Sequence, residues 1–303
     1  MMSEAERILR ESCGDRVRRN FPLAPLTTFR IGGPASLFLE PESMEDLQAV
    51  SRAHVQTGVP LVVLGKGSNV LISDVGIEAL VLRLGRGFRW SARDGLRLSA
   101  GAAMPLGAFA NVALQHALSG LEFGVAIPAS VGGAVRMNAG AHRGNMAGIV
   151  ESAECFLAET GEVARVPAAE AGFVYRDSAL PGIVISTVVR LAEGDRAEIR
   201  ATMDEAREWR RSTQPLAEPN CGSVFRNPPD DHAARLIQEA GGKELSVGAA
   251  AVSQKHANFI TAGEGARAAD VLSLIRAVQA LVEARFGVTL QREVHLLGDF
   301  DDE

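Results

Sequence analysis

The sequence lacks any run of eighteen consecutive apolar residues, the length that an α-helix needs to cross a bilayer. It also lacks the basic start and apolar stretch of a secretory signal peptide. Instead, residues 1–15 mix charged and apolar side chains, as in a short amphipathic helix. These absences argue against a transmembrane helix, and they predict a cytoplasmic location.

Cysteine is scarce, and basic residues are not in excess. The three cysteines, Cys13, Cys155 and Cys221, lie far apart with no CxxC pair, which excludes a disulfide framework or a zinc site of that kind. The six histidines are scattered, without an HExxH motif or a His/Cys cluster, so we expect no metal site. A net charge of −6 gives no reason to expect nucleic acid or an anionic membrane as a partner.

What is present is typical of an ordinary soluble globular protein. The chain has 303 residues, 47% of them hydrophobic and 22% charged, which is enough for two or three domains. Hydrophobic periodicity and capping residues predict helices at 43–57, 106–118, 195–212, 233–240 and 268–286. Strands are predicted at 35–39, 60–64 (short and buried), 79–84, 96–100, 150–158, 162–166 and 183–191, with 252–260 mostly extended and a last strand at 288–297.

A stretch at 127–142, reading IPASVGGAVRMNAGAH, is the most informative part of the chain. Pro128 favours an extended Ile127, and the adjacent Gly132 and Gly133 allow a tight turn or the close approach of a ligand. Free N–H groups among such small residues, at the head of a helical turn, predict a neutral cradle for a diphosphate. The alternative is a Gly/Ala-rich turn that merely packs against a sheet. The stretch does not have the GxGxxG spacing of a Rossmann fold.

A second loop of this kind follows the strand predicted at 60–64. It comprises Gly65, Lys66, Gly67, Ser68 and Asn69, at the carboxyl end of that strand. Glycine, serine and asparagine there suit a second turn in contact with phosphate. Two such loops in one chain suggest a ligand of dinucleotide size.

Seven segments, in this order, resemble the UDP-N-acetylenolpyruvoylglucosamine reductase family. They are TTFRIGG from Thr27, LGKGSNVLISD from Leu64, IPASVGGAVRMNAGA from Ile127, YRDS from Tyr175, PNCGSVFRNP from Pro219, VSQKHANFI from Val252 and FGVTLQREV from Phe286. Each segment is short, but seven in one order are hard to obtain by chance.

The resemblance implies an α+β fold. A two-part FAD-binding unit of the vanillyl-alcohol-oxidase (PCMH) type would span residues 1–84 and 85–200, and a smaller α/β substrate-binding domain would span residues 201–303. It also implies FAD as cofactor and NADPH as co-substrate. The residues implied to bind FAD are Gly65, Lys66, Gly67, Ser68, Asn69, Ile127, Pro128, Ser130, Gly132, Gly133, Asn138, Ala139 and Gly140.

The implied reaction reduces the enolpyruvyl ether of a UDP-sugar to UDP-N-acetylmuramate, in peptidoglycan precursor synthesis. Hydride goes to C3 of the enolpyruvyl group and a proton to C2. Arg176 resembles the arginine that binds the substrate carboxylate and stabilises the enolate. Glu293 resembles its carboxyl partner, and Ser223 resembles the hydroxyl that delivers the proton. Outside these motifs, a lone Arg, Ser or Glu would be read as solvated surface or a helix cap.

Substrate contacts are implied for Tyr175, Asn227 and Lys255, where Lys255 suits a phosphate as a point charge. A solvated surface residue is the alternative for any lysine. Cys221, two residues before Ser223, has no histidine near it in sequence, and we expect it to be packed rather than nucleophilic.

Some positions depart from the family pattern. Tyr175 is the single tyrosine, so the tyrosine-bearing lid of the longer subclass is missing and the shorter subclass fits. Ala129 replaces a usual glycine, HRGN at 142–145 replaces small residues and an acid, and GKELSVGAA at 242–250 differs from the usual pattern. We expect the flavin contacts to differ most at Ala129 and Arg143.

Two other readings stay open at this point. One is a different FAD-dependent oxidoreductase of the same fold, which would have no reason to keep Arg176, Ser223 and Glu293 together. The other is a non-catalytic protein that binds a flavin or a nucleotide sugar, which would not need a proton donor. We expect a monomer in which NADPH and the sugar nucleotide use one site in turn, because no separate nucleotide-binding fingerprint is present.

Overall fold

The chain folds into two compact units, each assembled from three separate segments. The computed structural model describes residues 1–141 and 144–300, so the departures noted at His142 and Arg143 lie outside the described residues. The first unit comprises Met1–Arg19, Leu37–Lys66 and Ala79–Arg210, and the second comprises Asn20–Ser36, Gly67–Glu78 and Arg211–Glu303. The chain therefore passes from one unit to the other several times.

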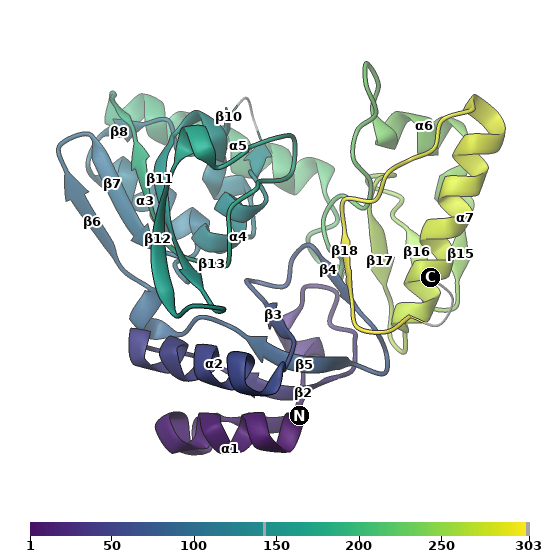
Figure 1. The fold of residues 1–303 in the computed structure, drawn as a ribbon. Helices are drawn as coiled ribbons and strands as arrows, with labels where there is room; N and C mark the ends of the chain where they lie inside the picture. The colour runs from purple at the N-terminus through teal and green to yellow at the C-terminus, as the bar shows by residue number, and fades with distance from the viewer. Residues whose placement is uncertain (142–143, 301–303) are drawn as a thin grey trace. The chain divides into compact units, whose positions relative to one another are not determined.

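A four-stranded sheet with the order β1-β2-β5-β3 lies next to two N-terminal helices (Figure 1). Its elements are α1 (Met2–Cys13), β1 (Arg18–Pro22), β2 (Pro34–Leu39), α2 (Met44–Thr57), β3 (Leu61–Val63) and β5 (Ile77–Leu82). The helix predicted at 43–57 is confirmed, and Ser43 caps it by accepting a hydrogen bond from the Asp46 amide. Leu47 and Val50 on its inner face are fully buried with Leu9 of α1.

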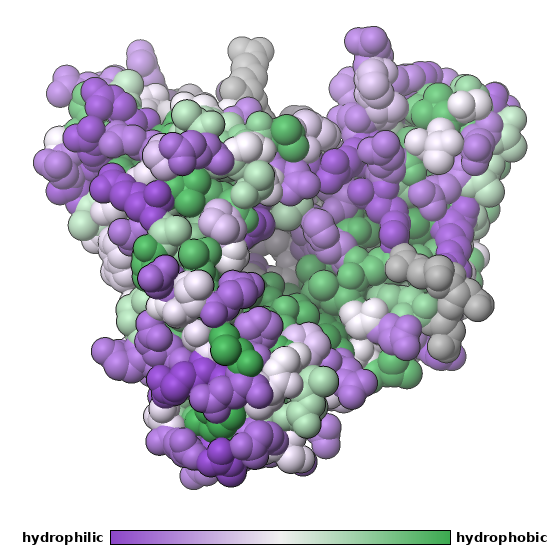
Figure 2. All heavy atoms as spheres, viewed as in Figure 1, coloured by the Kyte–Doolittle hydropathy of each residue, from purple (hydrophilic) through white to green (hydrophobic). Residues whose placement is uncertain are grey.

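The helix α1 is amphipathic, as the sequence predicts. Ala5, Ile8 and Leu9 are buried, whereas the surface over this helix is mostly hydrophilic (Figure 2). In the described part of the chain, no helix is both long enough and apolar enough to cross a membrane.

The prediction of a buried strand at 60–64 is wrong about burial. The strand β3 is at the edge of its four-stranded sheet, where it pairs in parallel with β5, and Val63 is 46% exposed. A short apolar run cannot distinguish a central strand from an edge strand, because both carry β-branched residues.

The rest of the first unit is built on an antiparallel five-stranded sheet with the order β12-β11-β13-β7-β6. Its strands are β6 (Ser91–Asp94), β7 (Arg97–Gly101), β11 (Val150–Leu157), β12 (Glu162–Pro167) and β13 (Ile183–Arg190), and its covering helices are α3 (Leu106–Gln115) and α4 (Val131–Arg136). The hairpin predicted across residues 159–161 is confirmed by the antiparallel pairing of β11 with β12. Two pairs of short strands, each strand two residues long, complete this part of the unit: β8 (Leu118–Ser119) with β14 (Ala192–Glu193), and β9 (Gly140–Ala141) with β10 (Gly144–Asn145).

The second unit has its own core, in which α7 packs against a small antiparallel sheet. Its elements are β4 (Val70–Ile72), α6 (Ala233–Glu239), β15 (Ser246–Val247), β16 (Ala250–Val252), β17 (Ile260–Ala262), α7 (Ala268–Phe286) and β18 (His295–Leu297). The charged helix α5 (Arg196–Thr213) carries the chain into this unit. The helix predicted at 268–286 is confirmed, with Gly287 in the left-handed conformation at its end (φ 69°).

Two segments of the second unit that were predicted to be extended are not extended over their whole length. Residues 253–259 connect the antiparallel strands β16 and β17, which pair Val252 with Ile260, so 252–260 is a turn between strands. Of the predicted strand at 288–297, only β18 forms, in parallel pairing with β4. The partner of β18 is more than two hundred residues away in sequence, which a local pattern cannot reveal.

Candidate functional site

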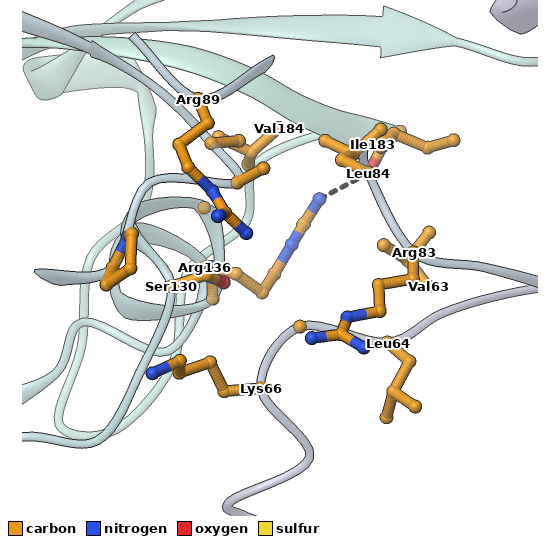
Figure 3. Close-up of a pocket in the computed structure, with 17 residues that line it drawn as sticks. Val63, Leu64, Lys66, Arg83, Leu84, Arg89, Ser130, Arg136, Ile183 and Val184 are labelled. Atoms are coloured by element: carbon orange, nitrogen blue, oxygen red, sulfur yellow. Dashed lines mark hydrogen bonds between the residues drawn. The ribbon is translucent and has the colours of Figure 1, made fainter. Parts of the chain in front are cut away.

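A pocket in the first unit gathers residues from five separate segments (Figure 3). They come from β3 and the loop after it, from the segment between β5 and β6, from the segment between β7 and α3, from α4 with its capping residue, and from the start of β13. Five residues of the predicted cofactor site line this pocket together: Gly65, Lys66, Ser130, Gly132 and Gly133.

Gly65 and Gly132 each lie too close to a neighbouring segment to carry a side chain. A Cβ atom at Gly65 would lie 2.8 Å from Ser130 Oγ, and one at Gly132 would lie 2.7 Å from the Cβ of Ala102. Ser130 itself caps α4, because its Oγ accepts a hydrogen bond from the Gly133 amide at 3.2 Å. The absence of side chains here gives the pocket a smooth backbone wall.

The expectation of a neutral cradle of free amides at the Gly132–Gly133 turn is wrong. The Val131 amide donates to Met104 O at 2.8 Å, and the Gly132 amide donates to Ala102 O at 2.9 Å. With the Gly133 amide donating to Ser130, all three already have partners inside the protein. The amides of Gly65 and Lys66 are different, since neither donates to a protein acceptor within the described ranges.

Positive charge, not neutral backbone, dominates the pocket. Lys66, Arg83, Arg89 and Arg136 line it, as Figure 3 shows. Arg83 and Arg89 come from the segment between β5 and β6, and Arg136 comes from α4. Sequence reasoning missed these arginines as a group, because residues 83, 89 and 136 share no local motif. The one available signal was Arg136, which lies inside the Gly-rich stretch.

The four cations are not equivalent. Arg136 donates to the carbonyl oxygens of Leu180 and Gly182, and burial lowers the pKa of its guanidinium. Arg83 lies 3.8 Å from Glu40. In the part of the chain that the structure describes, Lys66 and Arg89 form no ion pair. Their uncompensated charge, beside the amides of Gly65 and Lys66, fits an anionic group such as a diphosphate.

The other predicted cofactor residues lie outside the lining of this pocket, and their roles stay predictions. They are Ile127, Pro128, Asn138, Ala139 and Gly140 in the first unit, and Gly67, Ser68 and Asn69 in the second. Packing alone explains the glycine at position 67, because Gly67 has a φ of 62° and a Cβ there would lie 2.2 Å from Leu26 O. Asn69 donates through Nδ2 to Glu293 O at 3.2 Å, so it holds the backbone that carries a predicted catalytic residue.

Arg176 lies in the first unit, at the tip of a tight turn. Val174 and Asp177 exchange backbone hydrogen bonds of 3.0 and 3.3 Å across it. Arg176 adopts a left-handed backbone (φ 59°), which costs a residue with a Cβ about 1 kcal/mol. Its guanidinium carbon lies 5.0 Å from the centre of the Tyr175 ring, so the two predicted site residues are in contact.

Ser223 and Glu293 lie on neighbouring segments of the second unit. The Glu293 amide donates to Val224 O at 2.7 Å, directly after Ser223, and Phe225 forms a β-bridge with Arg292. The buried Asn258 holds the same segment, because its side chain bonds both the amide and the carbonyl of Phe225 at 2.9 and 2.8 Å. The structure therefore brings these two predicted catalytic residues together, although they are far apart in sequence.

Three further predicted positions have partners of their own in the second unit. Cys221 is buried, and burial, with a smaller contribution from the charge of Glu293, raises the pKa of its thiol, as suits a packed rather than a nucleophilic cysteine. Asn227 Oδ1 accepts from the Ala233 amide at the start of α6 (3.1 Å). Lys255 is exposed, and its Nζ donates to Arg211 O at 2.6 Å.

Two family models match the chain, one in each half. The FAD binding domain model matches residues 35–167, which include the pocket residues Gly65, Ser130 and Arg136. The model of the C-terminal domain of UDP-N-acetylenolpyruvoylglucosamine reductase matches residues 214–297, which include Ser223 and Glu293.

Relatives and solved structures agree with these models. The chain is 45% identical to UDP-N-acetylenolpyruvoylglucosamine reductase of Heliobacterium modesticaldum over 92% of this chain and 90% of that protein. It is 44% identical to the protein of the same name from Anaeromyxobacter sp. strain K over 100% and 92%. The crystal structure of the reductase (MurB) from Thermus caldophilus superposes with a TM-score of 0.82 at 38% identity, covering 93% of this chain and 99% of that one.

The FAD-binding fold extends to more distant proteins. A variant of berberine bridge enzyme superposes with a TM-score of 0.50 at 13% identity, over 63% of this chain and 44% of that one, which shows a shared fold only. Together with the mixed helix and strand content, this confirms an α+β fold with an FAD-binding unit of the vanillyl-alcohol-oxidase (PCMH) type. On the strength of relatives that match nearly its full length, the chain belongs to the UDP-N-acetylenolpyruvoylglucosamine reductase family.

Proposed function

We propose that this chain reduces UDP-N-acetylenolpyruvoylglucosamine to UDP-N-acetylmuramate, with NADPH as the reductant and FAD as the resident cofactor, in peptidoglycan precursor synthesis. Family membership at 45% identity over 92% of the chain carries the proposal. The positively charged pocket of the first unit supports it, because a dinucleotide cofactor contains a diphosphate that needs such a site.

The pocket residues fit FAD. Lys66 and Arg89 would face the diphosphate with their charge, and the amides of Gly65 and Lys66 would donate to its oxygens. Gly132 and Gly133 would supply a surface without side chains against which the ligand packs. When bound, FAD would take hydride from NADPH and give it to C3 of the enolpyruvyl group.

In the second half-reaction, the reduction of the enolpyruvyl group, the chain's own side chains would stabilise the negative charge and supply the proton. Hydride addition at C3 builds negative charge at C2, beside the substrate carboxylate. Arg176 would hold that carboxylate with its planar fork and stabilise the enolate. Glu293 would assist there, and the Ser223 hydroxyl would give its proton to C2.

Finer assignments complete the proposal. Tyr175, Asn227 and Lys255 would contact the substrate or its diphosphate, and a solvated surface lysine is the alternative for Lys255. The FAD-binding unit would comprise domains at 1–84 and 85–200, followed by the substrate-binding domain at 201–303. We further propose that the protein works in the cytoplasm as a monomer.

The first test is a spectrum and an assay. The purified protein should show the absorption of bound flavin, or gain it on incubation with FAD. It should oxidise NADPH rapidly only when the enolpyruvyl sugar nucleotide is present. The proposed function would be ruled out if the protein could not take up FAD, or if the rate of NADPH oxidation were the same with and without the enolpyruvyl sugar nucleotide.

The Ser223→Ala variant separates the two half-reactions. NADPH should still bleach the flavin at close to the wild-type rate, whereas product formation should fall by about 100-fold or more, because the variant has lost its proton donor. Stopped-flow absorbance of each half-reaction measures this. Ser246→Ala, an exposed serine of the same unit, should leave both rates unchanged. An equal loss of both half-reactions in Ser223→Ala would show that Ser223 has another role.

A further inference from the structure

We propose that Asn138 is a positioning residue, which fixes the tight turn that carries Arg176 rather than holding the cofactor. The inference rests on the proposed function, because it concerns the role of Arg176 toward the substrate carboxylate. It also revises the prediction that Asn138 belongs to the flavin site.

The turn at Arg176 needs support from outside. The exchange of hydrogen bonds between Val174 and Asp177 closes it, and the side chains of Val174 and Tyr175 are 59% and 51% exposed. The left-handed backbone of Arg176 (φ 59°) is unfavourable for a residue with a Cβ. A turn with these properties keeps a single geometry only if its neighbours impose it.

Asn138 provides that support. Its Nδ2 donates to Val174 O at 2.8 Å, and its Oδ1 accepts from the Ala147 amide at 2.9 Å. The residue is 8% exposed and is itself left-handed (φ 40°). Because its donor and its acceptor both have partners in the protein, the amide group bridges the segment after α4 to the Arg176 turn.

The chain that follows the turn is also held by hydrogen bonds to this region, at Arg136. Ser178 Oγ donates to Arg136 O at 2.7 Å, and the Arg136 guanidinium donates to the carbonyls of Leu180 and Gly182. Arg176 is thus flanked on both sides by bonds to residues 136–138. The last turn of α4 therefore connects the cofactor pocket, which Arg136 lines, with the Arg176 turn.

Gly140 leaves room for the arginine itself. A Cβ at Gly140 would lie 3.3 Å from Arg176 Nη1, and also 2.8 Å from the Cβ of Asn145. The guanidinium therefore lies against the backbone of residue 140. A fork that must meet a carboxylate with both nitrogens depends on such a fixed position, and a misplacement of about 1 Å reduces a rate by about 100-fold.

Two variants of Asn138 isolate this role. Asn138→Asp keeps the shape of the side chain but replaces the donor to Val174 O with an oxygen. Asn138→Gly removes the whole bridge and, because glycine accepts a left-handed backbone, keeps the chain foldable. Asn111→Asp is the matched control, because Asn111 Nδ2 also donates to a carbonyl at 2.8 Å, that of Gly107 on α3, and does not line the pocket.

Three measurements are made on the FAD-loaded protein. They are the dissociation constant of FAD from flavin fluorescence, the rate of flavin bleaching by NADPH, and the rate of reoxidation by the enolpyruvyl sugar nucleotide. Both Asn138 variants should bind FAD and react with NADPH within about 2-fold of wild type. Reoxidation should slow by about 100-fold, as expected for a displaced Arg176. Asn111→Asp should match wild type in all three.

A double-mutant cycle with Arg176→Ala tests whether Asn138 acts through the arginine. In that background, Asn138→Asp should slow reoxidation by no more than about 2-fold further. Additive losses would overturn the proposal, as would weaker FAD binding with normal reoxidation or no effect of either variant. If wild-type reduced flavin does not react with the enolpyruvyl sugar nucleotide at all, the proposed function fails instead, so the two failures are distinguishable.

Discussion

At the scale of single residues, Arg89 differs from the other two arginines of the pocket. It carries an uncompensated charge within the described residues, whereas Arg83 lies near Glu40 and Arg136 donates to two carbonyl groups. It is also an exposed residue, so any attraction to a bound diphosphate acts partly through solvent.

We therefore predict that Arg89→Gln weakens FAD binding by about 5-fold at low ionic strength, a loss typical of one partly exposed charge pair. The loss should shrink toward zero near 1 M salt, because screening removes the same interaction in the wild type. Titrations followed by flavin fluorescence at several salt concentrations measure it. Arg93→Gln is the control, since Arg93, on β6, donates through Nε to Gly95 O and does not line the pocket. A loss independent of salt would contradict a Coulombic role.

The residues at the site were predictable only where a motif carried them. Gly65, Ser130 and Gly132 were found because short Gly-rich motifs mark them, and all three line the pocket. Arg83 and Arg89 were missed, because their place in the pocket depends on how β5 and β7 pack against other segments. The amides of Val131 and Gly132 were misjudged for a similar reason, since their acceptors, Met104 and Ala102, follow β7.

At the scale of elements, one buried carboxylate joins α2 to the turn that follows α1. Asp46 is 5% exposed and accepts two hydrogen bonds of 2.6 Å from Arg16, in the 3₁₀ turn (Gly14–Arg16) after α1, and one of 2.7 Å from the Glu42 amide. The Arg16 guanidinium, as the largest cause, lowers the pKa of Asp46.

We predict that Asp46→Asn lowers the free energy of unfolding by about 2 kcal/mol at pH 7, because the buried acceptor loses its charge toward Arg16. The folded pKa lies below the unfolded value of about 3.9. The wild-type advantage is therefore present above about pH 4 and is lost as pH falls through the folded pKa. Urea unfolding of both proteins across this range measures it. Asp15→Asn, on a fully exposed side chain, should change stability by less than about 0.5 kcal/mol. A difference that persists undiminished at low pH would contradict the assignment.

Elements governed by local patterns were predicted well, and elements governed by distant partners were not. The helices α2 and α7 show apolar spacing and clear end signals, and both formed where expected. The segment 252–260 has extended-looking residues, but becomes a turn because β16 pairs with β17. Neither the length of β18 nor the edge position of β3 follows from its own residues.

At the scale of the whole molecule, the cofactor should act on stability as well as on chemistry. A ligand that binds only the folded state stabilises it by about 2.7 kcal/mol at a concentration 100 times its dissociation constant. Since the pocket that we propose for FAD lies in the first unit, we predict that added FAD slows hydrogen exchange there, first at the amides of Gly65 and Lys66. Riboflavin, which lacks the diphosphate, should not slow exchange at these two amides. Exchange that is unchanged across the first unit would place the cofactor elsewhere.

Because each unit is built from separate segments of the chain, the units can complete their folds at different times during translation. The chain leaves the second unit after residue 78 and returns to it at residue 211. Strand β4 is made early, but its parallel pairing of Val70 with His295 must wait for nearly the whole chain. Residues 79–210 supply both members of every strand pair in the five-stranded sheet, so that sheet can close earlier on the ribosome. The pocket for the cofactor would then be ready before the segment bearing Glu293 has been made, and the nascent protein could bind flavin before it could reduce a substrate.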